Sequence, residues 1–239
     1  MHASPSPQAA LRALADPRRA EGLHRFFKTG PGEYAEGDVF LGVPVPVVRK
    51  LVRTYENLAY ADIQKLLRTV VHEQRLLALL IVVRRYQRGD ERERAALYRL
   101  YTRHFRWINN WDLIDVTAEH VVGAHLFERD RAPLFRWAAA RSVWPRRIAV
   151  MATFHFIKRG DYADTLQLAE RLMGDPHDLI HKATGWMLRE IGNRDRPVEQ
   201  AFLDIHAARM PRPMLRYAIE KFSPDERQYF LRAGRDGSS

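Results

Sequence analysis

Apolar residues recur at the spacing of one helical turn along almost the whole chain. This spacing is followed by Leu76, Leu79, Leu80 and Val83, and again by Ile148, Ala152 and His155. Residues three to four positions apart share one face of an α-helix, so the pattern predicts helices that each bury one side. Only residues 38–48 (DVFLGVPVPVV) look extended, and their two prolines predict a loop that enters a helix. The sequence therefore predicts an all-α fold.

The predicted helices are separated by similar polar stops. The stops YQRGD, LFERD, FIKRGD and IGNRD end at Asp90, Asp130, Asp161 and Asp195, which are 40, 31 and 34 residues apart. Helical pairs that repeat every 30 to 47 residues or so are typical of HEAT and armadillo solenoids. An ordinary helical bundle is the alternative, because Arg, Gly and Asp are common at helix ends in any fold. We predict a right-handed α-solenoid of HEAT-like helical pairs, curved with a basic concave groove.

This solenoid is predicted to be one domain over residues 1–239, with flexible segments at about 1–9 and 233–239. The chain carries 39 Lys and Arg residues against 29 Asp and Glu residues, which gives a formal net charge of +10. Such a surplus favours an anionic partner, of which nucleic acid is the first candidate. The predominance of arginine over lysine fits phosphate binding, but a GC-rich genome explains it equally well.

Several classes of function are disfavoured by what the sequence lacks. It has no cysteine, which excludes disulfides, thiolate nucleophiles, iron–sulfur clusters and thiolate zinc sites. The longest aliphatic run, Leu76–Val83, is far shorter than the roughly 18 residues needed to span a bilayer. The first twenty residues lack the apolar core of a signal peptide. No phosphate-binding loop or histidine metal pattern is present, so we expect no metal or other cofactor. From the short aliphatic run and the polar start, we expect no membrane partner and a cytoplasmic, nucleoid-associated location.

The stretch NNWDLIDV, residues 109–116, places a tryptophan and a carboxylate one helical turn apart. Asn109 or Asn110 is a good N-cap, so a helix is predicted to begin near Trp111. Asp112 then lies in the first turn, where a carboxylate interacts favourably with the helix dipole. Asp115 shares a face with Trp111 at i+4. From spacing alone, the preferred interpretation of Asp115 is a solvated side chain paired with an arginine.

The segment Ser142 to Arg147 (SVWPRR) precedes another apolar run. Proline is favoured at the first helical position, so we predict a helix that begins at Pro145 with Arg146 and Arg147 in its first turn. Two cations at a helix start oppose the dipole and favour a bound anion, either a protein carboxylate such as Asp115 or a phosphate. Alternatively, the helix begins a residue or two away and the arginines merely extend to solvent.

Residues 180–189 (IHKATGWMLR) place two cations and an aromatic ring on one face. Lys182, Trp186 and Arg189 lie at i, i+4 and i+7, a pattern that favours contact with a nucleic-acid backbone. Gly185 in mid-helix costs about 1 kcal/mol relative to alanine, so we expect a close approach there. A core tryptophan with a small neighbour is the alternative interpretation.

The chain resembles the AlkD-like DNA glycosylases, HEAT-repeat enzymes that excise alkylated purines. The resemblance extends from about Leu23 to Leu231. It rests on the order and separation of five motifs: FFKTGPGEYAEGDVFLGV, W-D-x-x-D at 111–115, W-x-x-R at 144–147, GWMLRE at 185–190 and LRYAIE at 215–220.

The resemblance implies a set of site residues. The catalytic group would comprise Asp115, Trp111, Trp186 and Arg147, and the DNA contacts would be made by Phe26, Lys28, Arg146, Lys182 and Arg189. A relative carries tyrosine where Phe26 stands, which puts that hydroxyl contact in doubt. Relatives can also carry a neutral residue in place of Arg146. The family is expected to act on duplex DNA that contains alkylated bases, and we expect a monomer.

The implied reaction is hydrolysis of the N-glycosidic bond of a cationic purine of the N3-methyladenine or N7-methylguanine type. An abasic site would remain, and the base would not be flipped into a pocket. Two alternatives from other classes stay open. One is a non-catalytic HEAT-repeat protein that recognises damaged or branched DNA, and the other is a scaffold for an acidic protein partner.

Overall fold

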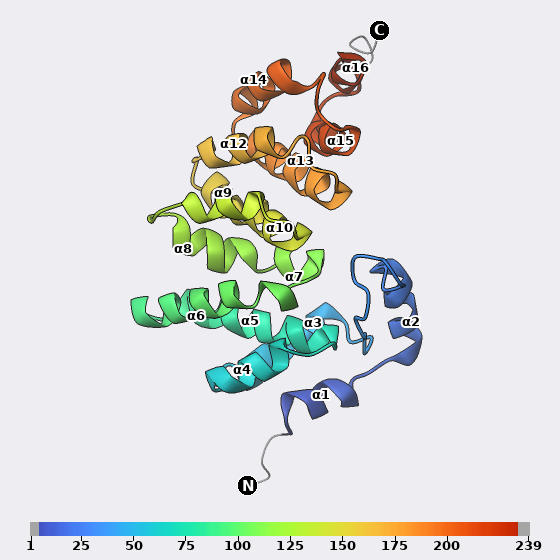
Figure 1. The fold of residues 1–239 in the computed structure, drawn as a ribbon, viewed down its shortest axis with the longest axis vertical. Helices are drawn as coiled ribbons and strands as arrows, with labels where there is room; N and C mark the ends of the chain where they lie inside the picture. The colour runs from blue at the N-terminus through green and yellow to red at the C-terminus, as the bar shows by residue number, and fades with distance from the viewer. Residues whose placement is uncertain (1–4, 234–239) are drawn as a thin grey trace. The chain divides into compact units, whose positions relative to one another are not determined.

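The computed structural model describes residues 5–233, and every regular element in this range is helical (Figure 1). Its one β-type contact is an isolated parallel bridge between Val39 and Val71. The predicted all-α class is therefore confirmed. The predicted extended segment is a loop, and its prolines lead into a helix at Val45. Within the same range, no helix is both long enough and apolar enough to cross a membrane.

The chain divides into two compact units, residues 1–121 and 122–239. The helices of the first unit are α1 (Pro7–Ala13), α2 (Pro17–Phe26), α3 (Val45–Tyr55), α4 (Tyr60–Leu67), α5 (His72–Arg88), α6 (Glu91–Arg103), the 3₁₀ turn η1 (Phe105–Trp107) and α7 (Trp111–Asp115). A π-helical turn, η2 (Glu119–Gly123), contains the boundary.

The helices of the second unit are α8 (Ala124–Leu126), α9 (Ala132–Ala138), α10 (Val143–Ala152), α11 (Phe154–Ile157), α12 (Ala163–Arg171), α13 (Asp178–Gly192), α14 (Arg196–His206), α15 (Arg212–Ala218), the 3₁₀ turn η3 (Ile219–Lys221) and α16 (Pro224–Ala233). The predicted flexible ends lie partly outside the described residues. Residues 7–9, within the segment predicted to be flexible, form the start of α1, which the hydroxyl of Ser6 caps. The flexibility itself stays a prediction.

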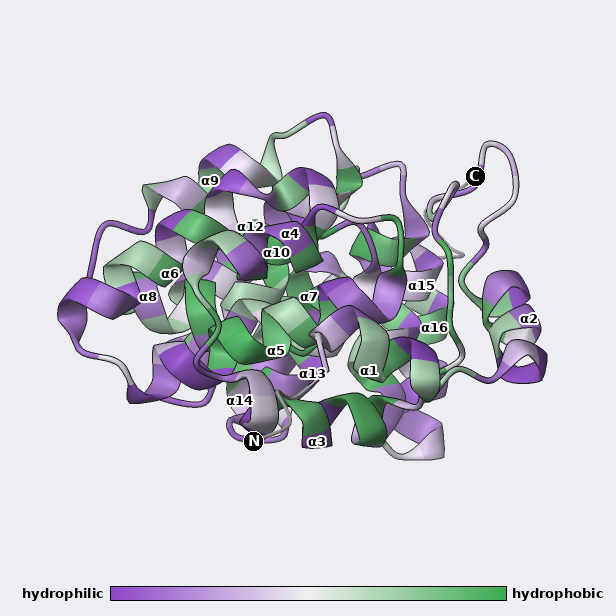
Figure 2. Ribbon diagram, turned by 90° about the horizontal axis from the view of Figure 1, so that it is seen from below, coloured by the Kyte–Doolittle hydropathy of each residue, from purple (hydrophilic) through white to green (hydrophobic). Residues whose placement is uncertain are grey.

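Each unit is built around one long helix. In the first unit, α5 packs against α3, α4 and α6, and nearly all of its residues up to Val83 are buried. Figure 2 shows apolar stretches on both α5 and α3. In the second unit, α13 packs against α10, α14 and α15. A helix that is apolar on most sides is stable only when neighbours cover it, so these two helices organise their units.

The polar stops have different structural roles. Asp90 and Asp195 are N-caps, and their carboxylates accept hydrogen bonds from the backbone of α6 and α14 respectively. Asp130 accepts a hydrogen bond from the amide of Ala132 at the start of α9. Asp161 instead pairs with Arg131 at 2.7 Å. Two of the four stops thus end in the N-cap of the next helix, whereas the solenoid curvature stays a prediction.

Candidate functional site

Helix α7 begins at Trp111, as the sequence predicted. The side chain of Asn110 is fully buried and accepts a hydrogen bond from the Trp111 amide at 2.8 Å. Asp115 is the last residue of α7, one helical turn from Trp111, and its side chain is partly exposed. Burial is the main reason that the pKa of Tyr101 is raised, and the negative charge of Asp115 adds to this shift. The charge of Asp115 is therefore felt at the buried hydroxyl of Tyr101, while its own side chain is partly exposed.

The indole of Trp111 is held by aromatic residues from the start of the chain. Its ring lies 5.3 Å from that of Phe27 and 5.9 Å from that of Phe26, and its Nε1–H donates a hydrogen bond to the hydroxyl of Tyr34 at 3.2 Å. Phe26 is 62% exposed. Sequence reasoning missed Tyr34, although it lies within the first motif. Tyr34 thus places a tyrosine hydroxyl beside Trp111. Position 26, where a relative carries tyrosine, is a phenylalanine and offers no hydroxyl.

The loop that carries Tyr34 is shaped by left-handed residues and anchored to α5. Lys28 is the one described non-glycine residue with a positive φ, at 53°, and its exposed side chain follows the aromatic pair. Gly42 has a φ of 83°, and a Cβ there would lie 2.2 Å from the carbonyl oxygen of Asp16, so only glycine fits. Buried Glu73 accepts hydrogen bonds from the amides of residues 41, 42 and 43. This carboxylate ties the loop to the first turn of α5.

A buried network of charged side chains lies beside α7. His72 Nε2 lies 2.7 Å from an oxygen of Asp112, and His72 Nδ1 lies 3.7 Å from Asp38. Arg75 bridges two more groups, with nitrogens 2.5 Å from Asp38 and from the amide oxygen of Asn109. The sequence assigned Asp112 only to the helix dipole, whereas the structure adds a histidine partner 40 residues away.

The network shifts the pKa values of Asp38 and His72. Burial alone would raise the pKa of Asp38, but His72 and Arg75 together hold it below the usual value. Burial works in the opposite direction on His72, yet its contacts with Asp112 and Asp38 raise the pKa of the imidazole. Asp38 is thus favoured in its charged form and His72 in its protonated form. Trp111 is therefore the first residue of a helix that Asn110 caps. The residue after it, Asp112, is anchored by its contact with His72.

In the second unit, the predicted start of α10 at Pro145 was wrong. The helix begins at Val143, and Ser142 caps it by accepting a hydrogen bond from the amide of Trp144. Proline is tolerated anywhere in the first turn because the amides there have no partner within the helix. A serine cap therefore determines the start, and Arg146 and Arg147 lie just after the first turn.

The two arginines of this segment have protein partners. Arg146 lies 2.7 Å from Asp175 and also donates hydrogen bonds to the carbonyls of Ala140 and Arg141. Its predicted DNA contact stays a prediction, but its position is explained by a protein carboxylate. Arg147 is only 5% exposed and donates a hydrogen bond to the carbonyl of Leu179 at the start of α13. Each guanidinium is thus held in a defined orientation.

Helix α13 presents the predicted face of Lys182, Trp186 and Arg189, all partly exposed. The Nε1–H of Trp186 donates a hydrogen bond to Glu190 at 3.1 Å, and Arg189 forms an ion pair with Glu220. Burial would raise the pKa of Glu190, but its bonds to Arg194 and Trp186 lower it, which favours the anionic acceptor. The side chain of Lys182 has no hydrogen bond or ion pair with any residue in the described range. Its ammonium group is therefore available to an anion.

Gly185 is closely approached, as the sequence predicted. A Cβ added there would lie 2.2 Å from the carbonyl oxygen of Met214 and 2.7 Å from the Cβ of Tyr217. The approaching group is the backbone of α15, so packing between two helices explains this glycine. The close contact also fixes the face of α13 that carries Trp186.

The structure places the predicted residues in two sets. Phe26, Lys28, Trp111 and Asp115 belong to the first unit, and Arg146, Arg147, Lys182, Trp186 and Arg189 belong to the second. That the two sets form one site stays a prediction. Among residues 5–233, no cluster of three or more His, Cys, Asp or Glu side chains could hold a metal ion.

Two of the comparisons with known proteins find a similarity. A family model described as DNA alkylation repair enzyme matches residues 7–222. A solved structure, described as a predicted DNA alkylation repair enzyme from Enterococcus faecalis, is similar with a TM-score of 0.68 and 16% identity. The match covers 88% of this chain and 97% of that one, and at this identity it establishes likeness of fold alone. No curated protein sequence matches the chain.

Proposed function

Because the chain belongs to the DNA alkylation repair enzyme family, we propose that it hydrolyses the N-glycosidic bond of cationic alkylated purines in duplex DNA. The observation that carries the proposal is a partly exposed carboxylate, Asp115, one turn from an indole held in place by Tyr34 and Phe27. The same proposal includes a solenoid whose basic groove receives the duplex and places both sets of site residues along it.

Alkylation at N3 or N7 makes the purine a good leaving group. The bond electrons pass to the base, which leaves as a neutral molecule, while positive charge develops on the deoxyribose. A negatively charged group stabilises that charge in the transition state. Asp115 is the group that we assign to this role. It would also orient a water molecule that adds to the sugar carbon and would accept the proton that this water loses.

The remaining site residues would position the strand. Trp111 and Trp186 present aromatic faces that stabilise a nearby cation by about 0.5–2 kcal/mol each. Arg147, held by the Leu179 carbonyl, would bind a phosphate beside the lesion, and Lys182 would bind another. Such a site needs no pocket for an extruded base, which favours cationic lesions over neutral ones.

The test is base release from a duplex that contains N7-methylguanine. Asp115→Asn keeps the size of the side chain but removes its charge, and we expect its single-turnover rate to fall by about 10²- to 10³-fold. The matched control is Asp62→Asn, which neutralises a surface aspartate paired only with Lys65 and should leave the rate unchanged. Base release that is equally fast in all three proteins would overturn the role of Asp115.

Binding measurements separate the alternatives. Tight binding of duplex DNA with no base release by the wild type would identify a non-catalytic DNA-binding protein. If the wild type neither binds duplex DNA nor releases the base, the result would favour a scaffold for an acidic protein. Such a scaffold would not show the steep salt dependence that a DNA-binding protein shows with duplex DNA.

A further inference from the structure

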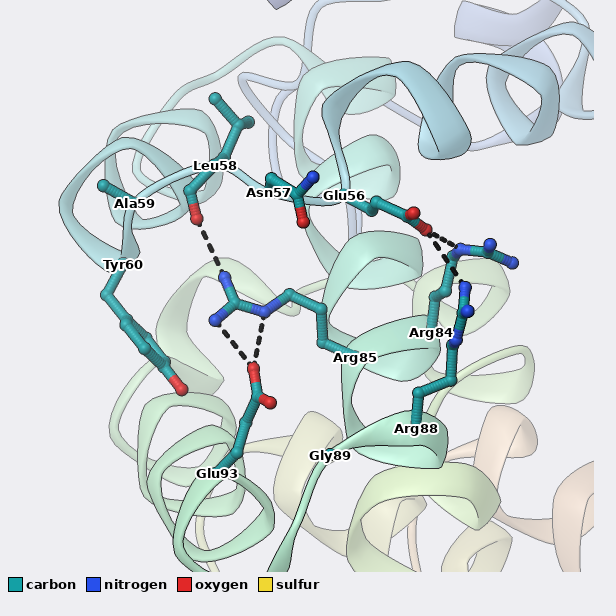
Figure 3. Close-up of a pocket in the computed structure, with 10 residues that line it drawn as sticks. All are labelled: Glu56, Asn57, Leu58, Ala59, Tyr60, Arg84, Arg85, Arg88, Gly89 and Glu93. Atoms are coloured by element: carbon teal, nitrogen blue, oxygen red, sulfur yellow. Dashed lines mark hydrogen bonds and ion pairs between the residues drawn. The ribbon is translucent and has the colours of Figure 1, made fainter.

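A groove in the first unit combines an apolar floor with an arginine-rich rim. Its floor consists of Val52, Leu80 and Val83, and its volume is about 190 Å³. The rim carries Arg49 and Arg53 from α3 and Arg84 from α5. Together with Arg88 of α5, which lines the second hollow described next, these residues are called the arginine groove. A second hollow of about 540 Å³, which shares Arg84, continues it toward the turn between α3 and α4 (Figure 3).

The positive charge of the arginine groove is only partly neutralised by carboxylates of the protein. Figure 3 shows Arg84 and Arg88 reaching the same carboxylate, that of Glu56. Its hydrogen bond with Arg84 is the main cause of its lowered pKa, and the charges of Arg88 and Arg53 add to the effect. Three guanidinium groups therefore surround one carboxylate, which leaves a local excess of two positive charges.

The donors of these arginines are incompletely used. Arg84 bonds Glu56 through Nε, and its two terminal nitrogens have no hydrogen-bond partner among the described residues. Arg88 approaches Glu56 only to 3.6 Å and is 65% exposed. Arg85 is the contrast, since it bonds Glu93 at 2.7 Å and the Leu58 carbonyl at 2.8 Å and lies over a tyrosine ring. Arg85 builds the wall of the hollow, whereas Arg84 and Arg88 can bind an additional anion.

We propose that the arginine groove binds the phosphodiester backbone of nucleic acid, as a second site apart from the residues around Trp111. Arg84 lies 12 residues along α5 from His72, which corresponds to about 18 Å. Arg49 and Arg53 are spaced i, i+4, and so are Arg84 and Arg88, which repeats the positive charge about every 6 Å along both helices. Regularly repeated charge with forked donors fits a polyanion of evenly spaced phosphates better than a single small ion.

This inference rests on the proposed function, because the partner is the same duplex. The groove would grip DNA away from the lesion and would raise affinity for any sequence, damaged or not. It would make no contribution to the chemical step. Its effect is therefore expected in the salt dependence of binding and not in the rate of base release at saturating protein.

The experiment compares two double variants of equal charge in fluorescence-anisotropy titrations with an undamaged duplex of about 30 base pairs over a series of salt concentrations. Arg53→Gln/Arg88→Gln removes two groove charges, and Arg12→Gln/Arg103→Gln removes two exposed arginines from α1 and α6. Each lost phosphate contact lowers the slope of log affinity against log salt by about 0.9. We expect the groove variant to lose between one and two units of slope and about tenfold or more in affinity, and the control to change much less.

The outcomes separate this inference from the proposed function. Equal slopes for the two double variants, with base release intact, overturn the groove site alone. No binding of duplex by the wild type overturns both proposals. A groove variant that keeps the DNA slope but loses binding of polyglutamate identifies an acidic protein as the occupant and overturns the nucleic-acid assignment. A lower slope with an unchanged single-turnover rate at saturating protein is the result that supports it.

Discussion

The two units hold their tryptophans by different means. Trp111 is fixed by partners that are remote in sequence, with the hydroxyl of Tyr34 lying 77 residues away, whereas Trp186 bonds Glu190 on its own helix. The two units also differ in how they accommodate a buried acid. In the first unit, Asp38 has cationic partners, but in the second unit one oxygen of buried Glu199 has no hydrogen-bond partner. The first arrangement depends on tertiary contacts between segments, and the second depends on single helices and their packing.

The largest expected effect comes from breaking the buried charge network of the first unit. Arg75 is 1% exposed and bonds both Asp38 and Asn109. Arg75→Met would leave the buried carboxylate of Asp38 without its nearest cationic partner, so we expect the free energy of unfolding to fall by about 3–5 kcal/mol in urea denaturation. Arg84→Met on the same helix removes a partly exposed ion pair and should cost about 1 kcal/mol or less. Equal losses in the two variants would show that the network does not stabilise the unit.

In the second unit, the corresponding test is the contact between α13 and α15. Gly185→Ala places a methyl group against the backbone carbonyl of Met214, which cannot move without shifting α15. We expect a loss of about 1–3 kcal/mol, measured by thermal or urea denaturation. Gly22→Ala is the matched control, because nothing lies within 4 Å of a Cβ at that position of α2. That variant should gain up to about 1 kcal/mol from helix propensity. If Gly185→Ala has the same free energy of unfolding as the wild type, the packing of α13 against α15 does not need this close approach.

The same contrast explains which features could be predicted from the sequence. The start of α7 was predicted correctly because its cap, Asn110, is the neighbouring residue. The close approach at Gly185 was also predicted, since a glycine inside a helical pattern is itself a local signal. Local signals also compete, and the serine cap of α10 determined its start where the proline had suggested a later one.

Tertiary partners gave no such signal. Tyr34, His72 and Arg75 all lie at least 34 residues from the groups that they contact around α7. Nothing in the spacing of a single sequence reports which distant side chains meet. The candidate residues in the sequence were therefore identified by their motifs, whereas the groups that hold them in place required the structure.

The smallest expected effect is the pH dependence of stability that Glu199 gives to the second unit. Glu199 is 2% exposed and is packed against Gly192 at the end of α13. Burial raises its pKa to about 8, although the charges of Arg196 and Arg189 act in the opposite direction. Between its unfolded pKa near 4.5 and this value, the folded protein binds one proton more than the unfolded chain. Stability from this group is therefore fully present below pH 4.5 and is lost as the pH rises toward 8.

Glu199→Gln should remove this slope, because the amide cannot ionise. Between pH 6 and pH 7, we expect the free energy of unfolding of the wild type to fall by about 1.4 kcal/mol more than that of the variant. His72 is present in both proteins, so its contribution cancels in the difference. Glu170→Gln, at an exposed position of α12, should keep the pH dependence of the wild type. If the wild type and Glu199→Gln lose stability in parallel, Glu199 is already ionised in the folded protein, and the second unit compensates its buried charge as fully as the first.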